Sequence, residues 1–236
     1  VAPQRGVDLV VCLDVSRSML VQDADPDRLT RAVRDIGALA DHVRGDRLAL
    51  VVFAGDARLA APLTRDASTV AALAAAANPY SVARGGTDLG AALETALDCL
   101  ADATGDHEAV LLVTDGEDLD GRGLRTAETL AARGIRVHCV GVGSRAGAKI
   151  PDGGGFVRGP DGRDVITALV QDTLQRLAES TGGVYRDAAD AASPLVELYD
   201  DEVAPMARKA FEESRRDERI PRFQWPLAAL FALWIL

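Results

Sequence analysis

Four long apolar runs, separated by helical patterns, constrain the fold of this chain more than any other feature. Each run is largely apolar, which is typical of parallel strands buried on both faces. The runs occupy residues 7–13, 47–53, 107–114 and 135–142. Strands that alternate with helices predict an α/β fold. We expect a Rossmann-like, doubly wound, mainly parallel central sheet with helices on both faces.

Helices are expected between these strands. Apolar residues recur at helical spacing from Leu29 to Val43, with Asp25 as the expected N-cap and Pro26 at the first helical position. A last helix is expected to kink at Pro205. The other expected elements are helices at 68–77, 88–101, 123–133, 170–181 and 193–215, a strand at 184–188 and a short edge strand at 57–63 that Pro62 ends.

Residues 143–165 interrupt this alternation. The segment is rich in glycine and proline and contains Pro-Asp-Gly twice, which predicts a hairpin insertion with a turn at residues 160–162. The main domain is therefore expected at residues 1–200, with this hairpin inserted in it. Residues 201–222 are expected to form a kinked helical, basic linker.

The run WPLAALFALWIL closes the chain and follows a segment that mixes basic and aromatic residues. A membrane-spanning helix needs about 20 apolar residues, so the run is too short to span a bilayer as it stands. We expect residues 223–236 to be the start of a truncated transmembrane helix. A terminal helix docked on the core is the alternative.

Charge and cysteine content exclude some functions. The net charge of −10 and the lack of a basic stripe disfavour a nucleic-acid partner. Cys12, Cys99 and Cys139 lie far apart in apolar runs, so they are expected to be buried free thiols.

Oxygen-bearing side chains gather where predicted strands end or helices begin. In an open α/β sheet, ligands bind beyond the carboxyl ends of the strands. Hydroxyls and carboxylates without histidine or thiolate suit a hard cation, Mg²⁺ first and Mn²⁺ or Ca²⁺ next. The candidate metal ligands are Asp14, Ser16, Ser18, Thr87 and Asp115.

Three segments carry these residues: DVSRS, GGTDLG and TDGED. Together they resemble the metal-ion-dependent adhesion site of von Willebrand factor A (VWA) domains. That site combines Asp-x-Ser-x-Ser, a later loop threonine and a later Asp-Gly, and all three parts are present here in order. The segments DVSRSML, GDRLALVVFAG, GGTDLG, LLVTDGED and RFQWPLA are similar to the bacterial BatA/BatB (aerotolerance) type. The resemblance implies that Ser16, Ser18 and Thr87 touch the metal, while Asp14 and Asp115 act largely through water.

The same resemblance implies a function. A VWA domain would be a non-enzymatic protein–protein interaction module that binds an Asp or Glu of a partner through its metal. The family also implies assembly with other VWA proteins and with a MoxR-type AAA+ ATPase, at a bacterial plasma membrane. The basic residues before the closing run favour a cytoplasmic domain. The usual arrangement of the family places the domain outside, and we expect the outer side, with the cytoplasm as the alternative.

Two other functions are possible from the residues alone. Asp14 could be the nucleophile of a Mg²⁺-dependent phosphatase or hydrolase. Such enzymes need a second acid two residues on, and Ser16 stands there, without a base to assist it. A scaffold that has lost its metal is the third possibility, which the five intact ligands disfavour. Glu117 and Asp118 are expected to be solvated charges at a helix start, and His138 a satisfied core side chain.

Overall fold

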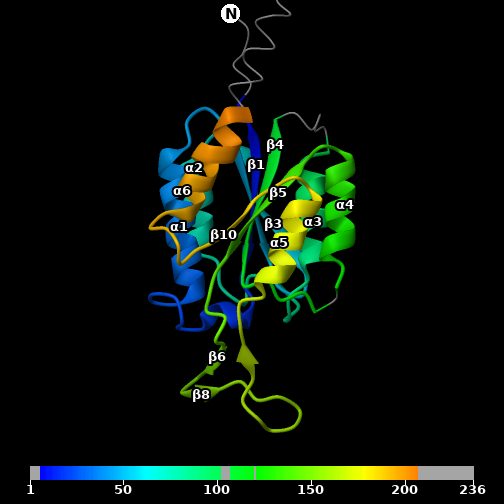
Figure 1. The fold of residues 1–236 in the computed structure, drawn as a ribbon. Helices are drawn as coiled ribbons and strands as arrows, with labels where there is room; N and C mark the ends of the chain where they lie inside the picture. The colour runs from blue at the N-terminus through cyan, green and yellow to red at the C-terminus, as the bar shows by residue number, and fades with distance from the viewer. Residues whose placement is uncertain (1–5, 102–106, 120, 207–236) are drawn as a thin grey trace, which may run out of the picture.

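A six-stranded sheet forms the centre of the structure, a computed structural model that describes residues 6–101, 107–119 and 121–206 (Figure 1). Its strand order is β10-β5-β4-β1-β2-β3, and all neighbouring pairs are parallel except β2 and β3. The strands are β1 (Asp8–Asp14), β2 (Arg47–Phe53), β3 (Ala57–Thr64), β4 (Glu108–Thr114), β5 (Arg136–Gly141) and β10 (Tyr185–Asp187). The predicted α/β, mainly parallel sheet is confirmed.

Helices cover both faces of the sheet, as the doubly wound prediction requires. One face carries α1, α2 and α6, and the other carries α3, α4 and α5 (Figure 1). The helices are α1 (Arg28–His42), α2 (Ala67–Ala75), α3 (Leu89–Cys99), α4 (Gly123–Ala132), α5 (Gln171–Ser180) and α6 (Pro194–Leu198). Alternate residues of β1 therefore enter different cores: Leu9 and Val11 face α1, whereas Val10 and Cys12 face α3.

Helix α1 begins two residues later than predicted. Its N-cap is Asp27 rather than Asp25, because the Asp27 carboxylate accepts a hydrogen bond from the backbone N–H of Thr30 at 2.8 Å. The next residue, Arg28, is the first residue of the helix, so Pro26 lies outside it. Two aspartates so close together offer the same capping chemistry, and the sequence does not distinguish them.

Gly37 lies inside α1, and a Cβ added there would meet no atom within 4 Å. Its φ angle is not positive, so alanine fits without strain and lowers the entropy of the unfolded chain. We expect Gly37→Ala to stabilise the domain by about 0.5–1 kcal/mol. Urea unfolding followed by circular dichroism measures this change, and an unchanged or lower midpoint would contradict it.

Strand β3 is an edge strand, as predicted, but Pro62 does not end it. The strand continues to Thr64, and the pairing register with β2 shifts between Leu50, opposite Ala61, and Leu48, opposite Thr64. Pro62 lies within this irregularity, where its missing N–H removes no regular ladder hydrogen bond. An edge strand therefore tolerates the proline through a local bulge.

The predicted hairpin insertion is present and protrudes beyond the carboxyl ends of the sheet strands (Figure 1). It contains two small antiparallel pairs. They are β6 (Ala148–Lys149) with β9 (Ile166–Thr167), and β7 (Pro151–Asp152) with β8 (Gly155–Phe156). The expected turn forms where the N–H of Gly162 donates to the carbonyl of Gly159 at 2.9 Å.

The chain after β10 returns along the α1 face. A π-helical turn, η2 (Tyr199–Val203), follows α6 directly and precedes Pro205. The Tyr199 hydroxyl donates to the Asp46 carboxylate at 2.5 Å, and Asp46 accepts from the N–H of Val7 at 2.8 Å. This fixes the end of the described domain near the start of β1.

Most of the predicted linker and the whole predicted membrane helix, residues 223–236, lie outside the described residues. Within the described ranges, none of the helices combines the length and hydropathy that crossing a bilayer requires. Two cysteines, Cys12 and Cys139, are buried free thiols as predicted, whereas Cys99 is only half-buried.

Candidate metal centre

The candidate site lies where the loops after β1 and β4 leave the sheet. These strands are neighbours, yet the chain runs from β1 to β2 on one side and returns to β4 on the other. The strand order therefore changes direction between them, which is where open α/β sheets bind ligands. Asp14 ends β1, and Asp115 follows the last residue of β4. The structure thus places both predicted carboxylates at the switch point.

Asp14, Ser16 and Ser18 form a connected, buried group. One Asp14 carboxylate oxygen accepts from the N–H of Ser16 at 2.8 Å, and the other accepts from the Thr114 hydroxyl at 2.6 Å. The hydroxyls of Ser16 and Ser18 lie 2.8 Å apart. Ser16 also caps a short 3₁₀ turn over Arg17–Leu20, and this turn brings the two alternate serines onto one side. The local sequence Asp-x-Ser-x-Ser therefore builds a compact oxygen cluster.

Asp115 is held by a buried arginine that sequence reasoning missed. Nη1 of Arg28 donates to an Asp115 oxygen at 2.8 Å, and both side chains are fully buried. The same guanidinium donates to both oxygens of Asp23, at 2.8 and 2.7 Å. The Thr167 hydroxyl lies 3.4 Å from Asp115 and donates to Glu117 at 2.9 Å. Nothing in the sequence around Arg28 distinguishes it from a surface arginine at a helix start.

Thr87 enters from a third loop and is also buried. Its backbone is fixed on both sides: the carbonyl of Thr87 accepts from the N–H of Leu119 at 3.0 Å, and the N–H of Asp88 donates to Ala54 at 2.8 Å. Asp88 then caps α3 through the N–H of Ala91. The structure records no direct hydrogen bond between Thr87 and the other four candidate ligands.

The loop that carries Thr87 packs closely on the end of β2. A Cβ built on Gly55 would lie 2.0 Å from the carbonyl oxygen of Gly85, so only glycine allows this approach. Gly86 follows with a φ of 100°, a left-handed conformation that favours glycine. The close approach of this loop therefore depends on the missing side chain at Gly55 and on the left-handed backbone of Gly86.

The carboxylates of Asp14 and Asp115 differ in their electrostatic surroundings. Burial raises the pKa of Asp14 to about 7, and the charge of Asp115 adds to this, while hydrogen bonds from Thr114 and Ser16 oppose it. Asp115 has the Arg28 guanidinium as a counter-ion, but no described arginine, lysine or histidine forms an ion pair with Asp14. A buried carboxylate without a counter-ion is unfavourable, and a bound cation would correct this. The residues present therefore fit a hard divalent metal.

The donor set also limits how such a metal could be held. Among residues 6–101, 107–119 and 121–206, no three His, Cys, Asp or Glu side chains are grouped so that they could hold a metal. Two carboxylates alone are few ligands for Mg²⁺. The hydroxyls of Ser16, Ser18 and Thr87 are therefore needed to complete the set.

Two expectations about neighbouring residues were wrong in part. Glu117 is half-buried and accepts from Thr167 rather than standing free in solvent, and burial, then the charge of Asp115, raises its pKa. Asp118 does lie at a helix start, where its carboxylate accepts a hydrogen bond from the N–H of Gly123 at 2.9 Å. Burial lowers the pKa of His138 to about 4, and its Nδ1 accepts from Val184, but Nε2 has no partner in the described part of the chain.

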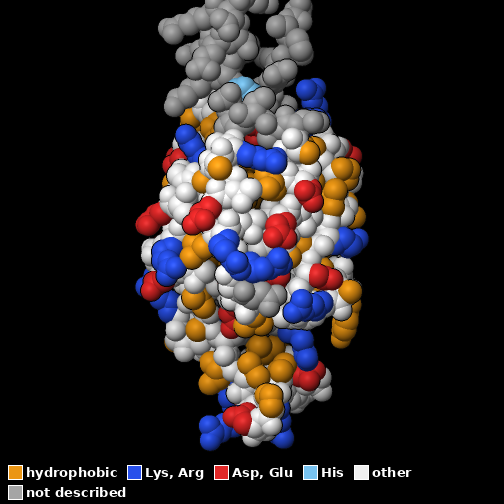
Figure 2. Space-filling view, turned by 90° about the vertical axis from the view of Figure 1, so that its right-hand side faces the viewer, with side chains coloured by type: hydrophobic (Ala, Val, Ile, Leu, Met, Phe, Trp, Pro, Cys, Tyr) orange, Lys and Arg blue, Asp and Glu red, His pale blue; other side chains and the backbone are white. Residues whose placement is uncertain are grey.

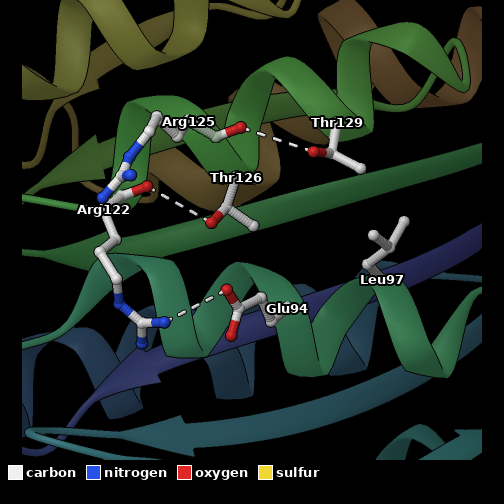
Figure 3. Close-up of a pocket in the computed structure, with 6 residues that line it drawn as sticks. All are labelled: Glu94, Leu97, Arg122, Arg125, Thr126 and Thr129. Carbon is white, nitrogen blue, oxygen red and sulfur yellow. Dashed lines mark hydrogen bonds and ion pairs between the residues drawn. The ribbon is translucent and has the colours of Figure 1, made fainter.

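A groove of about 340 Å³ lies between α3 and α4 (Figure 3). Arg122 crosses its end, with one nitrogen 3.3 Å from Glu94 and another 2.5 Å from Asp88. The hydroxyls of the two threonines that line it, Thr126 and Thr129, donate hydrogen bonds to the backbone carbonyls of the residues four positions earlier (Figure 3). The groove contains none of the candidate metal ligands, so we do not place the site there.

Comparisons with known proteins agree with this architecture. Residues 9–117 match the family model described as von Willebrand factor type A domain. An aerotolerance-related membrane protein from Bacteroides fragilis, solved with multiple mutations to serines, is 33% identical with a TM-score of 0.80, covering 85% of this chain and 100% of that chain. BatB from Bacteroides thetaiotaomicron is 32% identical with a TM-score of 0.80, covering 86% of this chain and 100% of that chain.

More distant structures share the fold alone. The manganese-loaded TRAP protein of Plasmodium vivax is 17% identical with a TM-score of 0.56, covering 82% of this chain and 72% of that chain. None of the curated proteins compared with the sequence matches it. The two Bacteroides structures exceed 30% identity over their whole length. With the strand order and the family match at the first four strands, they show that this chain belongs to the von Willebrand factor type A domain family.

Proposed function

We propose that the domain is a divalent-metal-dependent protein–protein interaction module without enzymatic activity, with Mg²⁺ as the first candidate metal and Mn²⁺ or Ca²⁺ as alternatives. The observation that carries the proposal is the buried Asp14 carboxylate, which forms no ion pair with any residue that the structure describes, while Asp115 pairs with Arg28. A metal bound there would supply positive charge and an open coordination position. Manganese in a protein of the same fold supports the choice of a divalent cation.

The chain's own residues would set the character of the site. Ser16, Ser18 and Thr87 offer neutral oxygens, so they leave most of the cation's charge uncompensated. Asp14 and Asp115 are held by Thr114 and Arg28, and this favours a role through water rather than direct contact. A partner's Asp or Glu would then be the strongest ligand for the open position.

The hydrolase alternative has less support. A nucleophilic Asp14 needs an oxygen that can reach a substrate, yet both of its oxygens accept hydrogen bonds and the side chain is fully buried. A general acid is also needed. Lys149, the one lysine among the described residues, is on the insertion and pairs with Asp164 at 2.9 Å.

The similarity to BatB and to a membrane protein suggests the cellular setting. We propose that the domain is anchored at the plasma membrane of a bacterium through residues 223–236, with the domain on the outer side and the cytoplasm as the alternative. Other VWA proteins and a MoxR-type AAA+ ATPase are the proposed partners. Sidedness is tested by labelling Cys99, the half-buried cysteine, in intact cells with a reagent that does not cross membranes.

Excess Mg²⁺ is expected to raise the melting temperature of the chain by about 5–10 °C relative to chelator. Ligand at about 100 times its dissociation constant contributes about 2.7 kcal/mol, and each kcal/mol corresponds to about 2–4 °C at this size. Asp14→Asn keeps the shape of the side chain but removes its charge, so the shift should disappear. Differential scanning fluorimetry measures both.

Asp98→Asn is the matched control, because Asp98 is an exposed aspartate of α3 outside the site. This variant should show the same Mg²⁺ shift as the wild type. Equal melting of the wild type in Mg²⁺ and in chelator would reject the metal-dependent module.

A further inference from the structure

Four exposed apolar side chains lie on the loops that flank the candidate metal centre and on the insertion beyond it. They are 70% exposed for Leu119, 64% for Ile166, 48% for Phe156 and 38% for Val170. We call these four residues the apolar rim. Figure 2 shows hydrophobic side chains gathered at the lower end of the molecule, where the insertion protrudes. Apolar side chains grouped on a surface are typical of interaction sites.

Residues on two sides of the apolar rim form backbone hydrogen bonds with loops of the metal centre. On one side, the N–H of Leu119 donates to the carbonyl of Thr87 at 3.0 Å. On the other, the N–H of Val170 donates to the carbonyl of Asp115 at 2.8 Å. Ile166 precedes Thr167, whose hydroxyl lies 2.9 Å from Glu117. Leu119, Val170 and Ile166 therefore lie on segments that are hydrogen-bonded to the loops of the candidate ligands.

The insertion, which carries Phe156 and leads directly into Ile166, is tied to the same loops. Arg17, between the two site serines, forms an ion pair with Asp152 at 2.9 Å. At the base of the insertion, the N–H of Ser144 donates to Asp23 at 2.9 Å, and Asp23 in turn binds Arg28. These two contacts hold the insertion beside the loop that follows β1, where it forms a wall next to the candidate metal centre.

The insertion differs in charge from the rest of the chain. Residues 143–165 contain four basic and three acidic side chains, so their net charge is +1, whereas the whole chain carries −10. Lys149 lies over the ring of Phe156, with its Nζ 5.1 Å from the ring centre. A weakly basic, apolar wall next to a cation site fits an anionic group on an apolar segment.

We propose that the apolar rim and the metal centre together bind a partner segment in which one carboxylate is flanked by apolar side chains. This inference rests on the proposed function, since the carboxylate needs the metal. It goes further by specifying the flanking residues. The carboxylate would enter the open metal position, while its neighbours would pack on Phe156 and Ile166 on one side and on Leu119 on the other.

A peptide-display library tests this chemistry without knowledge of the natural partner. Random peptides are selected on the 236-residue chain in Mg²⁺ and eluted with chelator. Selected peptides are expected to contain one Asp or Glu between apolar residues. For the best peptide, changing the carboxylate to its amide, or its apolar flanks to serine, should each weaken binding about tenfold or more in fluorescence anisotropy.

Matched variants of the domain complete the test. The double change Phe156→Ser with Ile166→Ser should weaken peptide binding about tenfold or more while the Mg²⁺ shift in melting temperature stays as in the wild type. Leu119→Ser alone should weaken binding less. The control is Leu59→Ser with Leu73→Ser, two partly exposed leucines on β3 and α2, which should leave binding unchanged.

The possible outcomes separate this inference from the proposed function. No Mg²⁺ shift in the wild type rejects the function itself. A normal Mg²⁺ shift, with peptide binding that survives the Phe156 and Ile166 changes, rejects only the apolar rim. Selection of no chelator-sensitive peptide, or of peptides without a carboxylate, also overturns the inference. Self-association that the same double change abolishes would make a second copy of this chain the occupant and overturn the assignment of a partner segment.

Discussion

Replacing Arg28 by methionine is expected to destabilise the folded domain by about 3–5 kcal/mol, the range typical of breaking a buried ion pair. Arg28 is fully buried and donates to Asp23 and to Asp115. Methionine fills much of the same space but supplies no charge or donor. Asp115 would then be a buried carboxylate without its counter-ion, and its charge would act on Asp14, which forms no ion pair within the described part of the chain.

A divalent metal should partly offset this loss. If the cation binds near Asp14 and Asp115, it replaces some of the positive charge that Arg28 supplied. The free energy of unfolding of Arg28→Met should therefore rise more with Mg²⁺ than that of the wild type. Urea unfolding of both proteins, in Mg²⁺ and in chelator, gives four free energies of unfolding. These show whether Mg²⁺ stabilises Arg28→Met more than the wild type.

Arg34→Met is the control for Arg28→Met, since Arg34 is an exposed arginine of the same helix. It should change stability by less than about 0.5 kcal/mol. A loss below about 1 kcal/mol for Arg28→Met would show that Asp115 finds another partner or takes up a proton when the arginine is removed.

Gly55→Ala is expected to destabilise the domain by about 3 kcal/mol and to abolish the Mg²⁺ shift. The added Cβ would lie 2.0 Å from the carbonyl oxygen and 2.8 Å from the carbonyl carbon of Gly85. Backbone atoms cannot turn aside as a flexible side chain can, so the loop must move. Thr87 lies two residues further along that loop and would lose its position.

Gly85→Ala is the matched control on the other side of the same contact. A Cβ on Gly85 would meet nothing within 4 Å, and its φ is not positive, so this change should cost little. Calorimetry of both variants with Mg²⁺ measures stability and metal binding together. A Gly55→Ala protein that keeps the full Mg²⁺ shift would show that Thr87 is not needed for the metal.

Local patterns in the sequence were sufficient for the fold. Largely apolar runs identified β1, β2, β4 and β5, because a strand buried on both faces needs apolar side chains on both. Helical spacing identified the intervening helices, and Gly134, with a φ of 75°, follows the end of α4. Errors occurred where several residues offer the same local chemistry, as Asp25 and Asp27 do at the start of α1.

The sequence also determined which residue types meet at the switch point, because strand ends of a parallel sheet share one edge. Only the tertiary structure revealed how these residues are bonded. Asp115 and Arg28 are 87 positions apart, and Thr167 reaches Glu117 across 50 positions. No local periodicity encodes such contacts, since they depend on how loops from different strands pack. The sequence by itself determined the sheet and the set of candidate oxygen ligands. The counter-ion of Asp115, the burial of Asp14 and the wall formed by the insertion arise only when distant segments come together, because the environment of a buried carboxylate depends on its neighbours in space.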